Sequence, residues 1–256
     1  FQPDVLRVLE RDHQAADVSR AVDVVRRHVS NISFDLIFGV PGQSVAQWEA
    51  DLRRALTFGP THLATYGLTY EKGTRLWQAW QRGDIQRLDE DHELAMYTLA
   101  MDVLEAADFE QYEISNFARP GFRCRHNQVY WANYAHFGVG VGAASYVRGE
   151  RKHNVRSTEG YISRALAGKP THFQAETLPP RQRALETIGQ QLRRREGIQR
   201  PPFLEQTGFN LDDLIGVALA HHTALGLLRD DGTTVCLTRR GRCVADAVVA
   251  ALWRPS

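Results

Sequence analysis

The chain has 256 residues, of which 43% are hydrophobic, and its formal net charge is +1. This length and composition suit one large domain, or one domain with a small appendage, and exclude general disorder. A charge so close to zero provides no long-range attraction for nucleic acid, an anionic membrane or a polyanionic substrate.

The cysteines and the N-terminus favour a cytoplasmic location. Cys124, Cys236 and Cys243 are too few and too widely spaced for a secreted disulfide framework. No window resembles a membrane span or a signal peptide. The chain begins without Met, so we expect it to start partway through a larger protein.

The first third of the chain alternates between helix and strand patterns. Apolar residues recur at helical spacing over residues 13–30, and residues 32–38 predict a short strand. A capping-box pattern at Ser44 starts the next predicted helix, and a second strand follows over residues 63–69. This order is a βαβ unit, which predicts a parallel sheet covered by helices.

The periodicity continues and then stops. Residues 74–82 and 89–107 predict two further helices, and residues 109–114 predict a strand. Residues 115–155 have no clear period and predict a loop-rich region, with a hairpin that turns at residues 148–150.

A boundary is expected where prolines interrupt the helical pattern at residues 168–181, which divides the chain into domains 1–168 and 169–256. The second domain predicts helices, a hairpin through residues 230–233 and one last helix. This order is similar to that of a winged-helix module.

Asp35 is the clearest anomaly in the first domain, because it interrupts an apolar strand and a buried carboxylate needs a partner. Near the carboxyl end of a parallel strand, such a residue faces the ligand crevice. The alternative is a buried structural pair with an arginine such as Arg11. The residues alone leave both interpretations open.

The most site-like segment gathers polar and aromatic residues after a Pro-Gly turn: Arg125, His126, Asn127, Tyr130 and Trp131. An imidazole beside aromatic side chains suits haem or another flat cofactor. Alternatively, His126 and Asn127 hold an irregular loop through backbone hydrogen bonds, which the residues alone slightly favour. His136 and His153 are further candidates. No zinc or iron-sulfur motif is complete, since the cysteines lack CxxC spacing.

Four segments together resemble the radical S-adenosylmethionine proteins related to oxygen-independent coproporphyrinogen oxidase, and within that group the HemW-type haem chaperones. They are residues 34–43, 66–69, 110–121 and 125–131. The most specific elements read Ile-Ser-Asn-Phe-Ala-Arg-Pro and His-Asn-x-x-Tyr-Trp.

The resemblance implies an α/β fold: the C-terminal part of a partial (β/α) barrel of the radical SAM type and the haem-site loop region over residues 1–168, and a winged-helix-like domain over residues 169–256. Family members bind a [4Fe-4S] cluster through a CxxxCxxC motif, and S-adenosylmethionine completes the iron coordination. That motif is absent from this sequence. We expect the cluster ligands upstream of Phe1.

The resemblance also carries residue roles. It places Arg11 and Asp35 at contacts with S-adenosylmethionine, which raises our expectation that Asp35 is a site residue, and it places backbone contacts near the adenine at Tyr66 and Leu68. It implies haem binding by His126, Asn127, Tyr130 and Trp131, with His126 as the iron ligand and Cys124 as a less favoured alternative. Many relatives carry His where this chain has Ala144, so no ligand role is carried over to that position.

The function that the resemblance implies is a haem chaperone that delivers haem to apo-haemoproteins such as respiratory-chain enzymes, without oxidase activity. Its implied partners include a second copy in a homodimer and transiently contacted membrane proteins, but no nucleic acid. The alternative is an oxygen-independent coproporphyrinogen III oxidase. A winged-helix DNA-binding regulator is a third interpretation, which the net charge disfavours.

Overall fold

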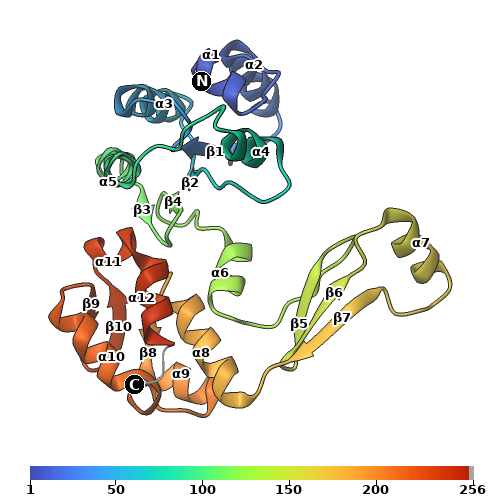
Figure 1. Cartoon of the computed structure of the whole chain (residues 1–256), viewed down its shortest axis with the longest axis vertical. Coiled ribbons are helices and arrows are strands. Elements are labelled where there is room, and N and C mark those ends of the chain that lie inside the picture. Colours follow the sequence, from blue (N-terminus) through green and yellow to red (C-terminus); the bar gives the residue numbers. More distant parts are fainter. Residues whose placement is uncertain (254–256) are drawn as a thin grey trace. The chain divides into compact units, whose positions relative to one another are not determined.

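The computed structural model describes residues 1–253 and shows an α/β protein with two compact units, Phe1–Arg123 and a second that begins at Cys124 (Figure 1). The division falls earlier than the predicted boundary at residues 168 and 169. The reason is that residues 124–168 pair and pack with the segments that follow them. Within the described part of the chain, no helix has the length and apolar character needed to cross a membrane.

The first unit combines helices with a four-stranded sheet. Its elements are α1 (Pro3–Val8), α2 (Ala15–Val25), β1 (Ser33–Phe38), α3 (Val45–Thr57), β2 (His62–Gly67), α4 (Arg75–Arg82), α5 (Glu90–Glu105), β3 (Glu110–Gln111) and β4 (Asn116–Ala118).

The predicted βαβ unit is present as β1, α3 and β2. The two strands run parallel, with Asp35 opposite Ala64. The capping box at the start of α3 is formed, since the backbone N–H of Gln47 donates to Ser44 Oγ at 3.2 Å and the backbone N–H of Ser44 donates to Gln47 Oε1 at 2.9 Å. Trp48 on α3 is fully buried and donates its indole N–H to a carbonyl of α5. Helices α3 and α5 therefore pack against each other and against the sheet.

The sheet is parallel between β1 and β2, as predicted, but it is mixed as a whole, because β4 pairs antiparallel with both β2 and β3. The strand predicted over residues 109–114 is a tight hairpin instead. Glu113 lies in the reversal and accepts hydrogen bonds from Asn116 Nδ2 and from the backbone N–H of Ser115. Its carboxyl group is buried, which raises the pKa of Glu113.

The second unit contains two small sheets and the remaining helices. Its elements are α6 (Arg125–Trp131), β5 (Ala144–Val147), β6 (Glu150–Asn154), α7 (Thr158–Leu166), β7 (His172–Thr177), α8 (Pro180–Gln191), β8 (Ile198–Gln199), α9 (Arg200–Thr207), α10 (Leu211–Ala224), β9 (Leu228–Asp230), β10 (Thr234–Leu237), α11 (Arg239–Cys243) and α12 (Ala245–Leu252).

Both predicted hairpins of the second unit are present. Strands β5 and β6 turn at residues 148–150, where Arg148 and Gly149 have positive φ angles, and β7 completes an antiparallel sheet (Figure 1). Strands β9 and β10 form the second hairpin, with β8 added in the order β8-β10-β9. Helices α8, α9, α10 and α12 surround that sheet with fully buried side chains such as Ile188 and Phe203. This is the predicted winged-helix arrangement.

Candidate functional site

Arg11 and Asp35 both line one cleft of the first unit. The cleft has a volume of about 220 Å³, and its lining includes residues of α1, α2, β1 and α3. Asp35 is exposed, and it forms no ion pair with any residue from 1 to 253. The alternative of a buried Asp35–Arg11 structural pair is therefore wrong. A guanidinium and an exposed carboxylate in one cleft suit a ligand with carboxylate and hydroxyl or ammonium groups.

A histidine of β2 that the sequence analysis did not single out lies on the same face of the sheet as Asp35. His62 is buried, and its ring nitrogens are 2.8 Å from Ser33 Oγ and 2.8 Å from Tyr112 Oη. Burial lowers the pKa of His62, and the negative charge of Asp35 acts in the opposite direction. The signal that could have revealed His62 is the parallel register, which aligns Ser33 with His62.

Tyr66 and Leu68 are not part of that cleft lining. Tyr66 pairs with Ile37 and lies on the same face of the sheet as Asp35, with its side chain 42% exposed. The backbone N–H of Leu68 donates to the carbonyl of Phe38 at 2.9 Å. That N–H is already used within the sheet, so a backbone contact with a ligand from Leu68 would have to use its carbonyl.

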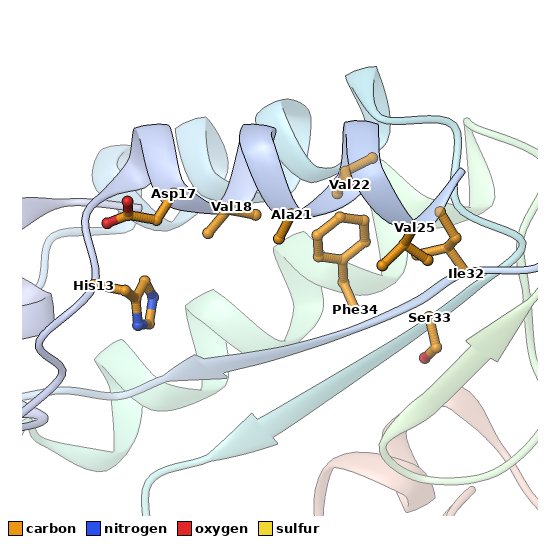
Figure 2. A pocket seen from close by; sticks show the side chains of 9 residues that line it. All are labelled: His13, Asp17, Val18, Ala21, Val22, Val25, Ile32, Ser33 and Phe34. Atoms are coloured by element: carbon orange, nitrogen blue, oxygen red, sulfur yellow. The ribbon is translucent and has the colours of Figure 1, made fainter. Parts of the chain in front are cut away.

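A second groove adjoins the first, between α2 and β1. Figure 2 shows valines of α2 above Phe34 and Ile32 of the strand segment, with His13 and Asp17 at one end. The groove has a volume of about 370 Å³ and an apolar middle. His13 also lines the cleft that contains Asp35, which makes it a polar group shared by both hollows.

The segment expected to be an irregular loop is the helix α6. His126 and Asn127 lie in its first turn, so they do not hold a loop through backbone hydrogen bonds. Residues four apart share a helix face. His126 therefore lies above Tyr130, and Asn127 lies above Trp131, on a different side. The four expected haem residues form two separate pairs.

The His126 pair continues into a row of rings. The ring of His126 meets the ring of Tyr130 edge-on, with centroids 4.7 Å apart, and Tyr130 meets His136 edge-on at 4.3 Å. Tyr146 of β5 lies 6.3 Å beyond His136, and the guanidinium of Arg151 is 5.7 Å from the Tyr146 ring. We call His126, Tyr130, His136 and Tyr146 the ring row.

The second pair has a different environment. Trp131 is half-buried, and the guanidinium of Arg193, just after the end of α8, lies 5.9 Å from its ring. Helix α6 packs against α8 on this side. Trp131 thus attaches α6 to the body of the unit. Cys124 occupies the N-cap position of α6 and is half-buried.

The donor groups of the described residues fit some cofactors and not others. No cluster of three or more His, Cys, Asp or Glu side chains suited to a metal ion occurs among residues 1–253. A [4Fe-4S] cluster therefore finds no ligand set in the described part of this chain. Haem needs fewer protein ligands, because the porphyrin supplies the equatorial nitrogens and the protein adds only an axial ligand. An imidazole in a row of aromatic rings meets that need.

Comparisons with known proteins agree with this architecture. Residues 178–244 match the family model of the HemN C-terminal domain. The haem chaperone HemW of Bacillus subtilis is 31% identical over 98% of this chain, and the HemW of Synechocystis is 35% identical over 77% of it. The chain spans 66% and 49% of these two relatives, respectively.

A solved structure has the same fold. The radical SAM enzyme coproporphyrinogen III oxidase (HemN) from Escherichia coli superposes with a TM-score of 0.78 over 98% of this chain and 62% of its own, at 16% identity. The chain is thus an α/β protein with the HemN fold and a HemN-type C-terminal domain. By its sequence it is a HemW-type protein, similar to these relatives over most of its length.

Proposed function

We propose that this chain is the haem-handling part of a haem chaperone, which binds haem and delivers it to apo-haemoproteins such as respiratory-chain enzymes. The observation that carries this proposal is the ring row on α6 and β5, in a chain that aligns with proteins named haem chaperones over nearly its whole length. Such a chaperone would act in the cytoplasm and contact membrane proteins only transiently.

The residues of α6 divide the work of binding between them. His126 is exposed, and its ring makes no hydrogen bond within residues 1–253. An imidazole nitrogen is therefore available to coordinate iron. The ring of Tyr130 is in edge contact with the ring of His126 and limits the orientations of the imidazole. Asn127 and Trp131 would support the site from the neighbouring side, where Trp131 fixes α6 against α8. The partial exposure of the site suits a cargo that has to leave again.

The first unit would bind S-adenosylmethionine. Arg11 would pair with the ligand's carboxylate, and Asp35 would accept from its hydroxyl or ammonium groups. Tyr66 and Leu68 would add contacts near the adenine. The [4Fe-4S] ligands of the family motif would come from outside this chain. Together, cluster and S-adenosylmethionine would support homodimer formation or haem transfer rather than oxidation of a porphyrin.

Titration of the purified chain with haemin, followed through the Soret band, tests the proposal. We expect saturable binding by the wild type and an affinity lower by about tenfold for His126→Ala, which corresponds to about 1.4 kcal/mol. His222→Ala is the matched control, because His222 lies on α10, away from the ring row. A wild-type chain without saturable haemin binding would overturn the proposal. Unchanged binding by His126→Ala would remove only the ligand role of His126.

The second candidate function is oxygen-independent oxidation of coproporphyrinogen III, which the shared HemN fold favours. The longer protein with its cluster reconstituted would provide the test, with porphyrin products measured by fluorescence. Turnover of coproporphyrinogen III would replace the chaperone proposal. We expect no turnover.

A further inference from the structure

The structure singles out His136 within the ring row because of one hydrogen bond. Its Nδ1 is 3.1 Å from the backbone carbonyl oxygen of Tyr134. A carbonyl can only accept, so Nδ1 carries the proton. In the neutral ring, Nε2 then keeps its lone pair. Histidines that bind metal ions in proteins typically have this arrangement, with one nitrogen donating to a backbone carbonyl and the other free for the metal.

The backbone at His136 is held as firmly as its ring. His136 and Tyr146 form an isolated antiparallel bridge, in which each backbone N–H donates to the other residue's carbonyl at 2.8 Å. The bridge attaches His136 to the edge of the β5–β6–β7 sheet. His126, by contrast, lies in the first turn of a seven-residue helix and has no hydrogen bond to its ring within residues 1–253. Of the two imidazoles, His136 is the preorganised one.

Other histidines lack the combination of a carbonyl hydrogen bond and two tyrosine ring contacts that His136 has. His222 also donates through Nδ1 to a backbone carbonyl, that of Ala218 at 2.8 Å, but among residues 1–253 its ring meets only the ring of the adjacent His221. His153 lies on the same sheet as Tyr146, opposite Ala144, outside the ring row. His136 is half-buried and joins a fixed tautomer to two tyrosine rings, Tyr130 and Tyr146. The hydrogen bond and the two ring contacts restrict the orientation of the His136 ring.

We propose that His136 is an axial haem ligand of this protein and binds the iron through Nε2. This inference rests on the proposed haem function and extends it, because His136 lies outside the His-Asn-x-x-Tyr-Trp element that suggested His126. Tyr130 is in edge contact with both imidazoles and so links the two candidate ligands within the ring row.

Ferric haem complexes of the wild type, His136→Gly and His153→Ala provide the test. We expect a low-spin imidazole signature in the Soret band and in electron paramagnetic resonance for the wild type and for His153→Ala. His136→Gly should show a high-spin spectrum and an affinity lower by about tenfold or more. Added free imidazole should restore the low-spin signature to His136→Gly, because it can occupy the axial position that the variant leaves open.

The outcomes separate the two proposals. If the wild type binds haemin and His136→Gly has an unchanged spectrum, the ligand role of His136 is overturned while the haem function stands. A spectrum of His136→Gly that free imidazole does not restore also overturns that role. If the wild type binds no haemin, the proposed function itself fails. His136→Gln, which keeps the polar contact to the Tyr134 carbonyl, checks folding by circular dichroism and should still lose the low-spin signature.

Discussion

At the scale of single residues, His62 makes the stability of the first unit depend on pH. Burial lowers its pKa below the ordinary value of 6.5. The unfolded chain therefore binds more protons than the folded chain as the pH falls below 6.5. The contribution of the buried neutral ring is present above pH 6.5 and is lost as the pH falls through the folded-state pKa. Each unit of difference between the two pKa values is worth about 1.4 kcal/mol.

We therefore expect the free energy of unfolding to decrease between pH 7.5 and 5.5, and to decrease less in His62→Gln. Urea unfolding at the two pH values measures this. The exposed His28→Gln is the control and should retain the wild-type pH dependence. Equal slopes for His62→Gln and the wild type would show that His62 does not titrate differently on folding.

Gly197 precedes β8 and allows a close approach that no side chain permits. Its φ angle is +65°, and a Cβ atom added there would lie 2.1 Å from the carbonyl oxygen of Val235. Gly197→Ala should lower the free energy of unfolding by about 3 kcal/mol or more, since both the backbone angle and the contact oppose it. Gly208→Ala is the matched control. It has a φ of +80° with open space around it, and should cost only about 1 kcal/mol. Thermal unfolding of both variants would compare the two costs.

At the scale of elements, the start of α3 depends on its capping box. Ser44→Ala removes the acceptor for the backbone N–H of Gln47 and should cost about 1 kcal/mol in urea unfolding. Ser163→Ala, inside the exposed helix α7, should change stability by less than about 0.5 kcal/mol. A smaller loss at Ser44 than at Ser163 would contradict the assigned role of the cap.

Elements with a strong local signal were predicted well, and those set by tertiary contacts were not. The cap and apolar spacing predicted α3 between its two parallel strands. Helix α5 was predicted as an element, but its apolar residues do not all face the core: Leu94 is 44% exposed, while Met96 is fully buried. Apolar residues of α5 occur on several sides of the helix, so their spacing does not define a single buried face. The hairpin of β3 and β4 depends on hydrogen bonds to Glu113, which no local pattern announces.

For the candidate site, too, the sequence pointed to side chains but not to the conformations that tertiary contacts set. Arg11 and Asp35 were expected together, and they line one cleft. The aromatic and imidazole groups of residues 125–131 were recognised, but their helical conformation was not, because seven mostly polar residues carry little helical signal. The position of His136 follows from its bridge to Tyr146, a pairing between residues ten apart in a region without regular period.

At the scale of the whole molecule, the two compact units divide after Arg123, whereas the sequence predicted a domain boundary between residues 168 and 169. Prolines interrupt the chain within residues 168–181, but β6, which precedes this segment, pairs with β7 inside it, and β5 pairs with β6 in the same sheet. Sequence composition records local breaks in helix or strand. It does not record whether a segment packs with the residues before such a break or with those after it.

The winged-helix arrangement of the second unit should not bind DNA. Helix α10 follows α9 in the position of a recognition helix, but it contains Asp212 and Asp213 and no lysine or arginine. With a net charge of only +1, the chain also lacks a general attraction for phosphates. Fluorescence anisotropy with labelled duplex DNA at 50 mM salt, where nonspecific contacts are strongest, should show no binding below about 10 μM protein. Tight, salt-dependent binding would revive the regulator interpretation.

Helix α6 has a consequence for finding related proteins. Because His126 touches Tyr130 one turn further along, the interval between them matters as much as the two side chains do. A single inserted or deleted residue would rotate one partner by about 100° around the helix axis and separate the rings, although every letter of the motif survived. Searches for similar carriers should accordingly permit substitutions within this segment while forbidding gaps.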